Sequence, residues 1–171
     1  MKSFFIPALQ KIIADLTEVL QSFSAKESNR VFYSGSSSAA QVADHVIKCC
    51  AGLPKMLAGG SIVNQRNYEE NVQKIEFIFL EFITKMQSPE FILPADKFFK
   101  TDNLQHALNK LLDKIVMINV QKDFNRTYSD FPFLQMGFFT GKERLCFSLE
   151  YTTGHLRKIK NIHQCLQIMQ Y

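Results

Sequence analysis

The sequence predicts a single α/β domain, in which helices flank a mostly parallel five-stranded sheet and an amphipathic helix leads the chain. Short apolar, β-prone runs alternate along the chain with segments of helical periodicity, a pattern typical of βαβ units. The 171 residues suffice for one ordinary domain, and a composition of 46% hydrophobic and 21% charged residues excludes a disordered chain. The sequence shows no internal repeat and no low-complexity linker, so we expect one domain over residues 1–171.

The clearest element is the amphipathic helix within residues 1–24. Its apolar residues recur every three or four positions, as one helix face requires: Ile6, Leu9, Ile12, Ile13, Leu16, Val19, Leu20 and Phe23. Pro7 fits the first helical turn, where the missing N–H donor is not needed. The polar residues 25–29 end the helix.

A strand, a tight loop and a second helix are predicted next. Residues 30–34 are apolar and β-prone, and the helix that follows carries apolar residues at helical spacing. The loop between them consists of the small residues Gly35, Ser36, Ser37 and Ser38. Ser38 with Gln41 three residues later fits a capping box, which places the start of the helix.

The alternation continues through the middle of the chain. Residues 55–58 and 91–93 are candidate strands, and apolar periodicity predicts helices over residues 68–87 and 102–115. The end of the last helix is ambiguous, because residues 115–120 also fit a strand.

The C-terminal third predicts a polar loop over residues 121–130, two strands and a closing helix over residues 156–169. The strands are expected at residues 133–139 and 145–150, separated by residues 140–143. A hairpin there is the main alternative to a parallel sheet. If these two strands pair antiparallel, the chain is an unrelated α+β interaction module.

Charge and cysteine usage indicate a cytoplasmic protein. The net charge of +4 is mild, and no block of five like charges marks a nucleic-acid arm, so we do not expect direct nucleic-acid binding. The basic residues near the C-terminus fit a solvated face better than an anion site: Lys142, Arg144, Arg157, Lys158 and Lys160. The four cysteines form no C-x-x-C pair and are interpreted as reduced thiols. We expect no signal peptide and no membrane span, since no apolar run reaches about 18 residues.

Residues 31–45, VFYSGSSSAAQVADH, resemble the first phosphosugar-binding loop and helix of the sugar isomerase (SIS) domain family. The resemblance is to the branch of phosphoheptose isomerases and replication initiator-associating proteins, whose strand is followed by C-G-N-G-G-S-A-x-x-A-x-H. Residues 68–72, 137–142 and 159–163 resemble later motifs of that branch in the same order. The resemblance implies a SIS-like fold with a leading helix.

The resemblance also implies a phosphate loop at Gly35, Ser36, Ser37 and Ser38, where hydroxyls and helix-terminal amides offer donors to an anion. A structural turn with a serine cap explains the same residues equally well. The motif serine of the family falls at Ala39, and the second family loop, residues 94–101, lacks its run of hydroxyls. Half of the phosphate site is therefore missing.

By the same resemblance, the metal ligands of phosphoheptose isomerases fall at His45, Cys49, Lys160 and Ile168. A charged lysine is a poor ligand and an isoleucine cannot ligate, so His45 and Cys49 are interpreted as vestigial. His106 and His163 have no recognisable nucleophile partner. We therefore expect no metal, no cofactor and no catalytic residue.

The functional prediction is a non-enzymatic adaptor or regulatory protein on a degenerate SIS fold, which binds a protein partner. The resemblance implies a homo-oligomer assembled through the first helix, with interface residues Leu9, Ile12, Leu16 and Val19. The alternative is a phosphosugar-binding protein or isomerase with a rearranged site at residues 35–38 and His45.

Overall fold

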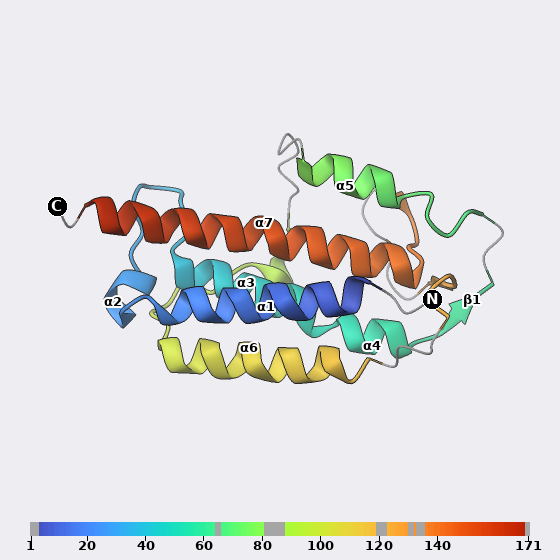
Figure 1. Cartoon of the computed structure of the whole chain (residues 1–171), viewed down its shortest axis with the longest axis horizontal. Helices are drawn as coiled ribbons and strands as arrows, with labels where there is room; N and C mark the ends of the chain where they lie inside the picture. Colours follow the sequence, from blue (N-terminus) through green and yellow to red (C-terminus); the bar gives the residue numbers. More distant parts are fainter. Residues whose placement is uncertain are drawn as a thin grey trace.

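The computed structural model describes residues 4–63, 66–80, 88–118, 123–129, 132 and 136–169, with the side chain of Leu80 left aside. Within these residues the chain is a mostly helical single domain (Figure 1). The predicted α/β class, with its SIS-like parallel sheet, is therefore wrong.

The elements run in the following order: α1 (Phe5–Gln21), α2 (Ala25–Ser28), α3 (Ala39–Ala51), α4 (Leu53–Ala58), β1 (Ser61–Ile62), α5 (Val72–Leu80), the 3₁₀ helix η1 (Glu90–Ile92), α6 (Thr101–Val116), β2 (Thr127–Tyr128) and α7 (Gly141–Ile168). In the described part of the chain the one sheet is the antiparallel pair of β1 and β2, in which Ser61 lies opposite Tyr128.

Four helices form a bundle. α1 packs against α6 and α7, and α3 packs against the same two helices, so that α1 and α3 lie diagonally opposite. α1 and α7 run in one direction, whereas α3 and α6 run in the other (Figure 1). α5 packs on the outer side of α7, and α7 is the longest helix, with 28 residues.

The bundle core is made of apolar residues at helical spacing, as the hydrophobic effect requires. Each helix contributes one stripe of buried side chains: Leu9, Ile13, Leu16 and Leu20 from α1, Ala39, Val42, Ala43 and Val46 from α3, Leu104, Leu108, Leu111 and Ile115 from α6, and Leu145, Leu149, Leu156 and Ile159 from α7. The predicted N-terminal helix and the helix over residues 102–115 are therefore confirmed.

The predicted strands are not formed. Residues 30–34 lie in a loop, residues 55–58 lie inside α4, and residues 91 and 92 belong to η1. Residues 145–150 lie inside α7. A short, mostly apolar run fits a buried strand and a buried helix turn equally well, and at residues 55–58 and 145–150 it is part of a helix.

Other boundaries also differ from the prediction. The helix expected over residues 68–87 begins at Val72, and its end, residues 81–87, lies outside the described residues. Residues 136–139 form no strand, and residues 133–135 are not described. Since residues 145–150 are helical, the antiparallel hairpin of the α+β alternative is wrong as well. The closing helix predicted over residues 156–169 is the second half of α7.

None of the described helices is both long enough and apolar enough to span a lipid bilayer.

Candidate functional site

The loop at residues 35–38 is a turn followed by a helix cap. Gly35 has a φ of 81°, a conformation that glycine adopts without strain. The Ser36 hydroxyl donates to the Tyr33 carbonyl at 2.9 Å. The Ser38 hydroxyl accepts from the Gln41 N–H at 3.2 Å, while the Gln41 side chain accepts from the Ser38 N–H at 2.9 Å. The predicted capping box is thus confirmed, and two of the three hydroxyls of the predicted phosphate loop serve the loop itself.

Ser37 faces α7 instead. The Lys158 ammonium lies 3.4 Å from the Ser37 hydroxyl oxygen and donates to it. An anion at the start of α3 would therefore meet one lysine and one hydroxyl. Phosphate binding at residues 35–38 stays a prediction.

His45 and Cys49 lie in a polar cluster between α3 and α7, together with Tyr151 and His155. The Nδ1 atom of His45 lies against the carbonyl of Ile92, and its Nε2 atom is hydrogen-bonded to the Tyr151 hydroxyl. The Cys49 sulfur lies 3.8 Å from the His45 Nε2 atom. The His155 ring centre lies 5.0 Å from that of His45 and 4.5 Å from that of Tyr151.

The hydrogen-bond partners of His45 indicate which of its ring nitrogens carries the proton. A carbonyl only accepts, so the Nδ1–H donates to Ile92 and the Nε2 atom accepts from the Tyr151 hydroxyl. Both ring nitrogens of His45 are thus satisfied, and the ring joins α3, η1 and α7. This is the arrangement of a hydrogen-bonded structural histidine.

Burial holds the remaining members of this cluster uncharged near neutral pH. It raises the pKa of Cys49 to about 12 and also raises that of the Tyr151 phenol. It lowers the pKa of His155 to about 3, and the electrostatic contributions of the neighbouring His45 and Lys158 act in the same direction. The Cys49 thiol is therefore protonated, and a protonated thiol is a weak nucleophile.

Sequence reasoning missed Tyr151 and His155. They are four residues apart and share one face of α7, but the prediction divided this helix into a strand, a loop and a shorter helix. Reading one helix through residues 141–168 would have placed them together.

The metal positions implied by the resemblance do not come together. Among the described residues, no group of three or more His, Cys, Asp or Glu side chains could hold a metal ion. Lys160 and Ile168 are exposed, and Ile168 follows Tyr151 by 17 residues, or about 25 Å along a helix.

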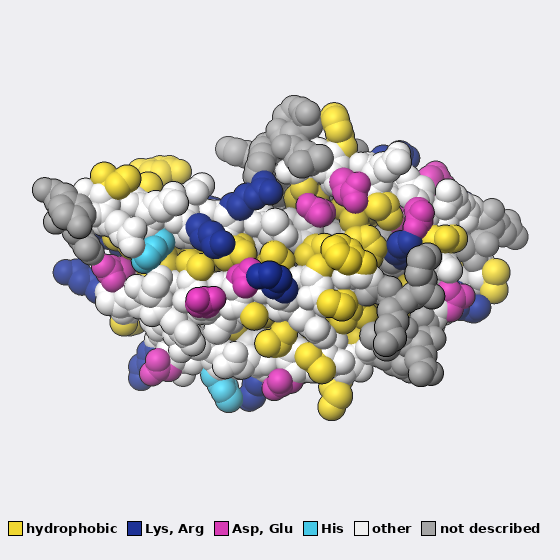
Figure 2. All heavy atoms as spheres, viewed as in Figure 1, with side chains coloured by type: hydrophobic (Ala, Val, Ile, Leu, Met, Phe, Trp, Pro, Cys, Tyr) yellow, Lys and Arg dark blue, Asp and Glu magenta, His cyan; other side chains and the backbone are white. Residues whose placement is uncertain are grey.

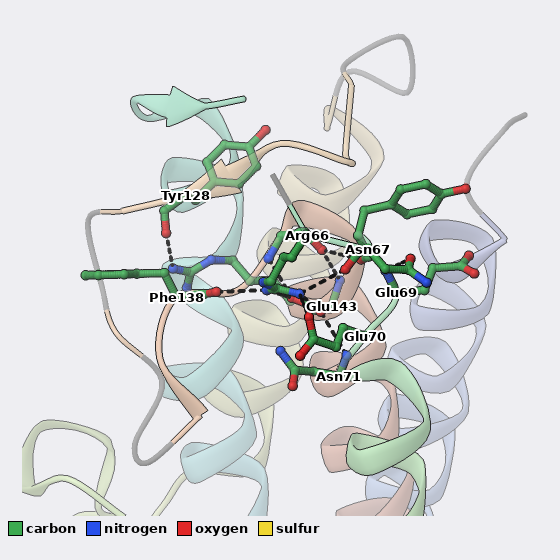
Figure 3. Close-up of polar contacts among 11 residues, drawn as sticks. Arg66, Asn67, Glu69, Glu70, Asn71, Tyr128, Phe138 and Glu143 are labelled. Carbon is green, nitrogen blue, oxygen red and sulfur yellow. Dashed lines mark hydrogen bonds and ion pairs between the residues drawn. The ribbon is translucent and has the colours of Figure 1, made fainter. Parts of the chain in front are cut away.

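A second polar cluster joins residues 66–71 to the start of α7 (Figure 3). Glu143 is fully buried, and its two carboxylate oxygens accept the two ends of the Arg66 guanidinium, each at 2.7 Å. One oxygen also accepts the Asn71 N–H at 3.0 Å, and the other accepts the Thr140 N–H at 2.8 Å. Arg66 further donates to the Phe138 carbonyl at 3.1 Å.

These contacts make Glu143 a structural residue. Each oxygen receives two donors, so the four acceptor positions of the carboxylate are filled. Burial would raise the pKa of Glu143, but the hydrogen bonds from Arg66, Thr140 and Asn71 outweigh it and hold that pKa below its usual value. The sequence signal was present, because Thr140 and Glu143 form a capping box, whereas the prediction treated residues 140–143 as the connection between two strands.

A groove of about 570 Å³ lies between α1 and α7 near their C-terminal ends. Its α1 wall consists of Asp15, Glu18, Val19 and Ser22, and its α7 wall of Lys160, His163, Gln164 and Gln167. On the face in Figure 2, basic side chains lie along the C-terminal half of α7, acidic and basic side chains lie next to each other along α1, and hydrophobic ones lie between the two helices.

The charges on the two walls do not pair with each other. Asp15 pairs with Lys11 on its own helix, at 2.8 Å. Within the described part of the chain, neither Glu18 nor Lys160 takes part in an ion pair. Each of these two side chains can therefore accept a charged partner from outside.

The predicted interface residues divide into two pairs. Leu9 and Leu16 are fully buried in the bundle core, whereas Ile12 and Val19 are half-buried. Leu9 and Leu16 therefore belong to the core of the chain itself and are not accessible to a partner. An interface through α1 stays a prediction, and its available residues are Ile12 and Val19.

The fold and these sites define a mostly helical bundle protein, with two internal polar clusters and a charged groove between its parallel helices α1 and α7. No protein-family model matches the chain, and comparisons with curated proteins and with solved structures find nothing similar. The SIS resemblance receives no support from them.

Proposed function

We propose that this protein is a non-enzymatic adaptor or regulatory protein of the cytoplasm, which binds a protein partner through the groove between α1 and α7. One observation carries the proposal. The groove has Asp15 and Glu18 on its α1 wall and Lys160 on its α7 wall, and neither Glu18 nor Lys160 takes part in an ion pair among the described residues. Complementary charges of this kind steer partners and fix their orientation.

The internal polar clusters support a binding role over a catalytic one. The hydroxyl of Tyr151 and both nitrogens of His45 are hydrogen-bonded inside the fold, and burial keeps the Cys49 thiol protonated. The oxygens of Glu143 are filled by donors of the chain itself. These groups stabilise the arrangement of the helices.

The experiment is quantitative affinity capture from the cells that make the protein, with three matched baits. The baits are the wild type, Lys160→Glu in the groove and Lys110→Glu on the exposed side of α6. We expect a stoichiometric protein on the wild type and on Lys110→Glu, and its loss on Lys160→Glu. Equal retention by all three baits, or no stoichiometric protein on the wild type, would contradict the proposal.

A further inference from the structure

We propose that the partner in the α1–α7 groove is a second copy of this chain, related to the first by a two-fold axis. This inference rests on the proposed function and names the partner. It follows from the groove itself, because one chain carries acidic side chains on one wall and Lys160 on the other.

A two-fold axis turns these walls into matching surfaces. In such an interface, residue i of one copy meets residue j of the other, and residue j meets residue i. Glu18 of each copy then faces Lys160 of the other, which forms two equivalent contacts between opposite charges. No ion pair inside the described part of the chain competes for either side chain.

The same end of the bundle exposes apolar surface that a second copy would cover. On the last turn of α7, Ile168 is 75% exposed, and Met169, which caps the helix, is 59% exposed. Val19 lies half-buried in the groove wall. Apolar and charged side chains thus lie near each other at this end of the bundle, and protein interfaces combine the two kinds.

The test is a charge-swap experiment on the whole chain, followed by sedimentation equilibrium in low salt. Four samples are compared with the wild type: Glu18→Lys, Lys160→Glu, an equimolar mixture of these two variants, and the double variant. In each single variant, two attractions become two repulsions, so we expect the dimer dissociation constant to rise about tenfold or more.

The mixture and the double variant should restore the dimer, because every contact across the axis then joins opposite charges again. The wild-type dimer should also weaken in 0.5 M salt, which screens these exposed charges. Circular dichroism of each variant checks folding, and Lys110→Glu is the control for charge alone.

Two results would overturn the inference. One is a wild type that stays monomeric over its soluble concentration range; the other is a dimer that neither single variant weakens. If the wild type is monomeric while Lys160→Glu still loses another captured protein, the second copy is wrong and the proposed function stands. If capture is insensitive to Lys160→Glu as well, both are wrong.

Discussion

Glu143 is a buried carboxylate whose partners come from two separate segments of the chain. It joins residues 66–71 to the start of α7 through Arg66 and the Asn71 N–H. Glu143→Gln keeps the shape of the side chain but removes its charge and two of its acceptor positions. We expect a loss of about 2 kcal/mol in the free energy of unfolding, measured by urea denaturation, since hydrogen bonds to a charged group are the strong ones.

The matched control is Glu69→Gln, which removes the exposed partner of Lys142. A surface ion pair contributes about 0–1 kcal/mol, so this variant should stay close to the wild type. A similar loss in both variants would show that the buried position of Glu143 is not what matters.

His155 makes the free energy of unfolding depend on pH. Its pKa is about 3 in the folded protein and about 6.5 in an unfolded chain, so the unfolded state binds the proton first as the pH falls. The stability that neutral His155 permits is therefore complete above pH 6.5 and is lost progressively between about pH 6.5 and pH 3. From pH 6 to pH 5 we expect a fall of about 1 kcal/mol in the free energy of unfolding.

His155→Phe should flatten this fall, because phenylalanine keeps the ring contact and does not titrate. His106→Gln, at an exposed position on α6, should leave the fall unchanged. Urea denaturation at pH 6 and at pH 5 measures both variants, and an equal slope in His155→Phe and the wild type would refute the assignment.

At the scale of single elements, the capping residue of α3 could be identified from the sequence. The Ser38 hydroxyl caps α3, whereas the Ser37 hydroxyl contacts only Lys158 among the described residues. Ser38→Ala should lower the free energy of unfolding by about 1 kcal/mol, and Ser37→Ala should change it by less than about 0.5 kcal/mol. Thermal denaturation of the two variants checks this difference.

The same two variants address the predicted phosphate loop. If residues 35–38 bind a sugar phosphate, Ser37→Ala should weaken the binding while leaving stability intact. An equal loss of stability in the two variants would contradict the capping role of Ser38.

The elements could be predicted where one apolar stripe repeats without interruption, and α7, although the longest helix, was not predicted as one element. α1 and α6 carry three or four repeats of one apolar stripe, and the sequence located both. The short runs at residues 55–58 and 145–150 carry one repeat each, which fits a strand or a helix. The capping box of Thr140 with Glu143 would have decided the latter run in favour of a helix.

At the scale of the whole molecule, the order and direction in which the helices pack could not be predicted from the sequence. α1 and α7 come from opposite ends of the chain and run parallel, side by side, so no local pattern indicates their contact. The long connection from α3 to α6 contains α4, β1, α5 and η1, and its alternating apolar runs imitate βαβ units. The groove and the cluster of His45 with Tyr151 both lie at the α7 interface, so neither could be derived before the packing was known.

The cysteines report on the integrity of the whole bundle. Cys165 is exposed, whereas Cys50 and Cys146 are buried and Cys49 is half-buried. Burial raises the pKa of Cys50 to about 11 and those of Cys49 and Cys146 to about 12. At pH 8 a thiol with a pKa of 12 is a thiolate in about one molecule in ten thousand, and the thiolate is the reactive form.

We therefore expect a disulfide reagent to label one thiol of the native protein quickly at pH 8, and Cys165→Ser to abolish that fast phase. The other three thiols should react only as the bundle opens. Their rates should then rise together with urea, with a slope near the 1–3 kcal/mol per molar that is typical of global unfolding. Two fast thiols in the native protein, or a much smaller slope for Cys49 alone, would mean that α3 separates from α7 without unfolding of the remaining bundle.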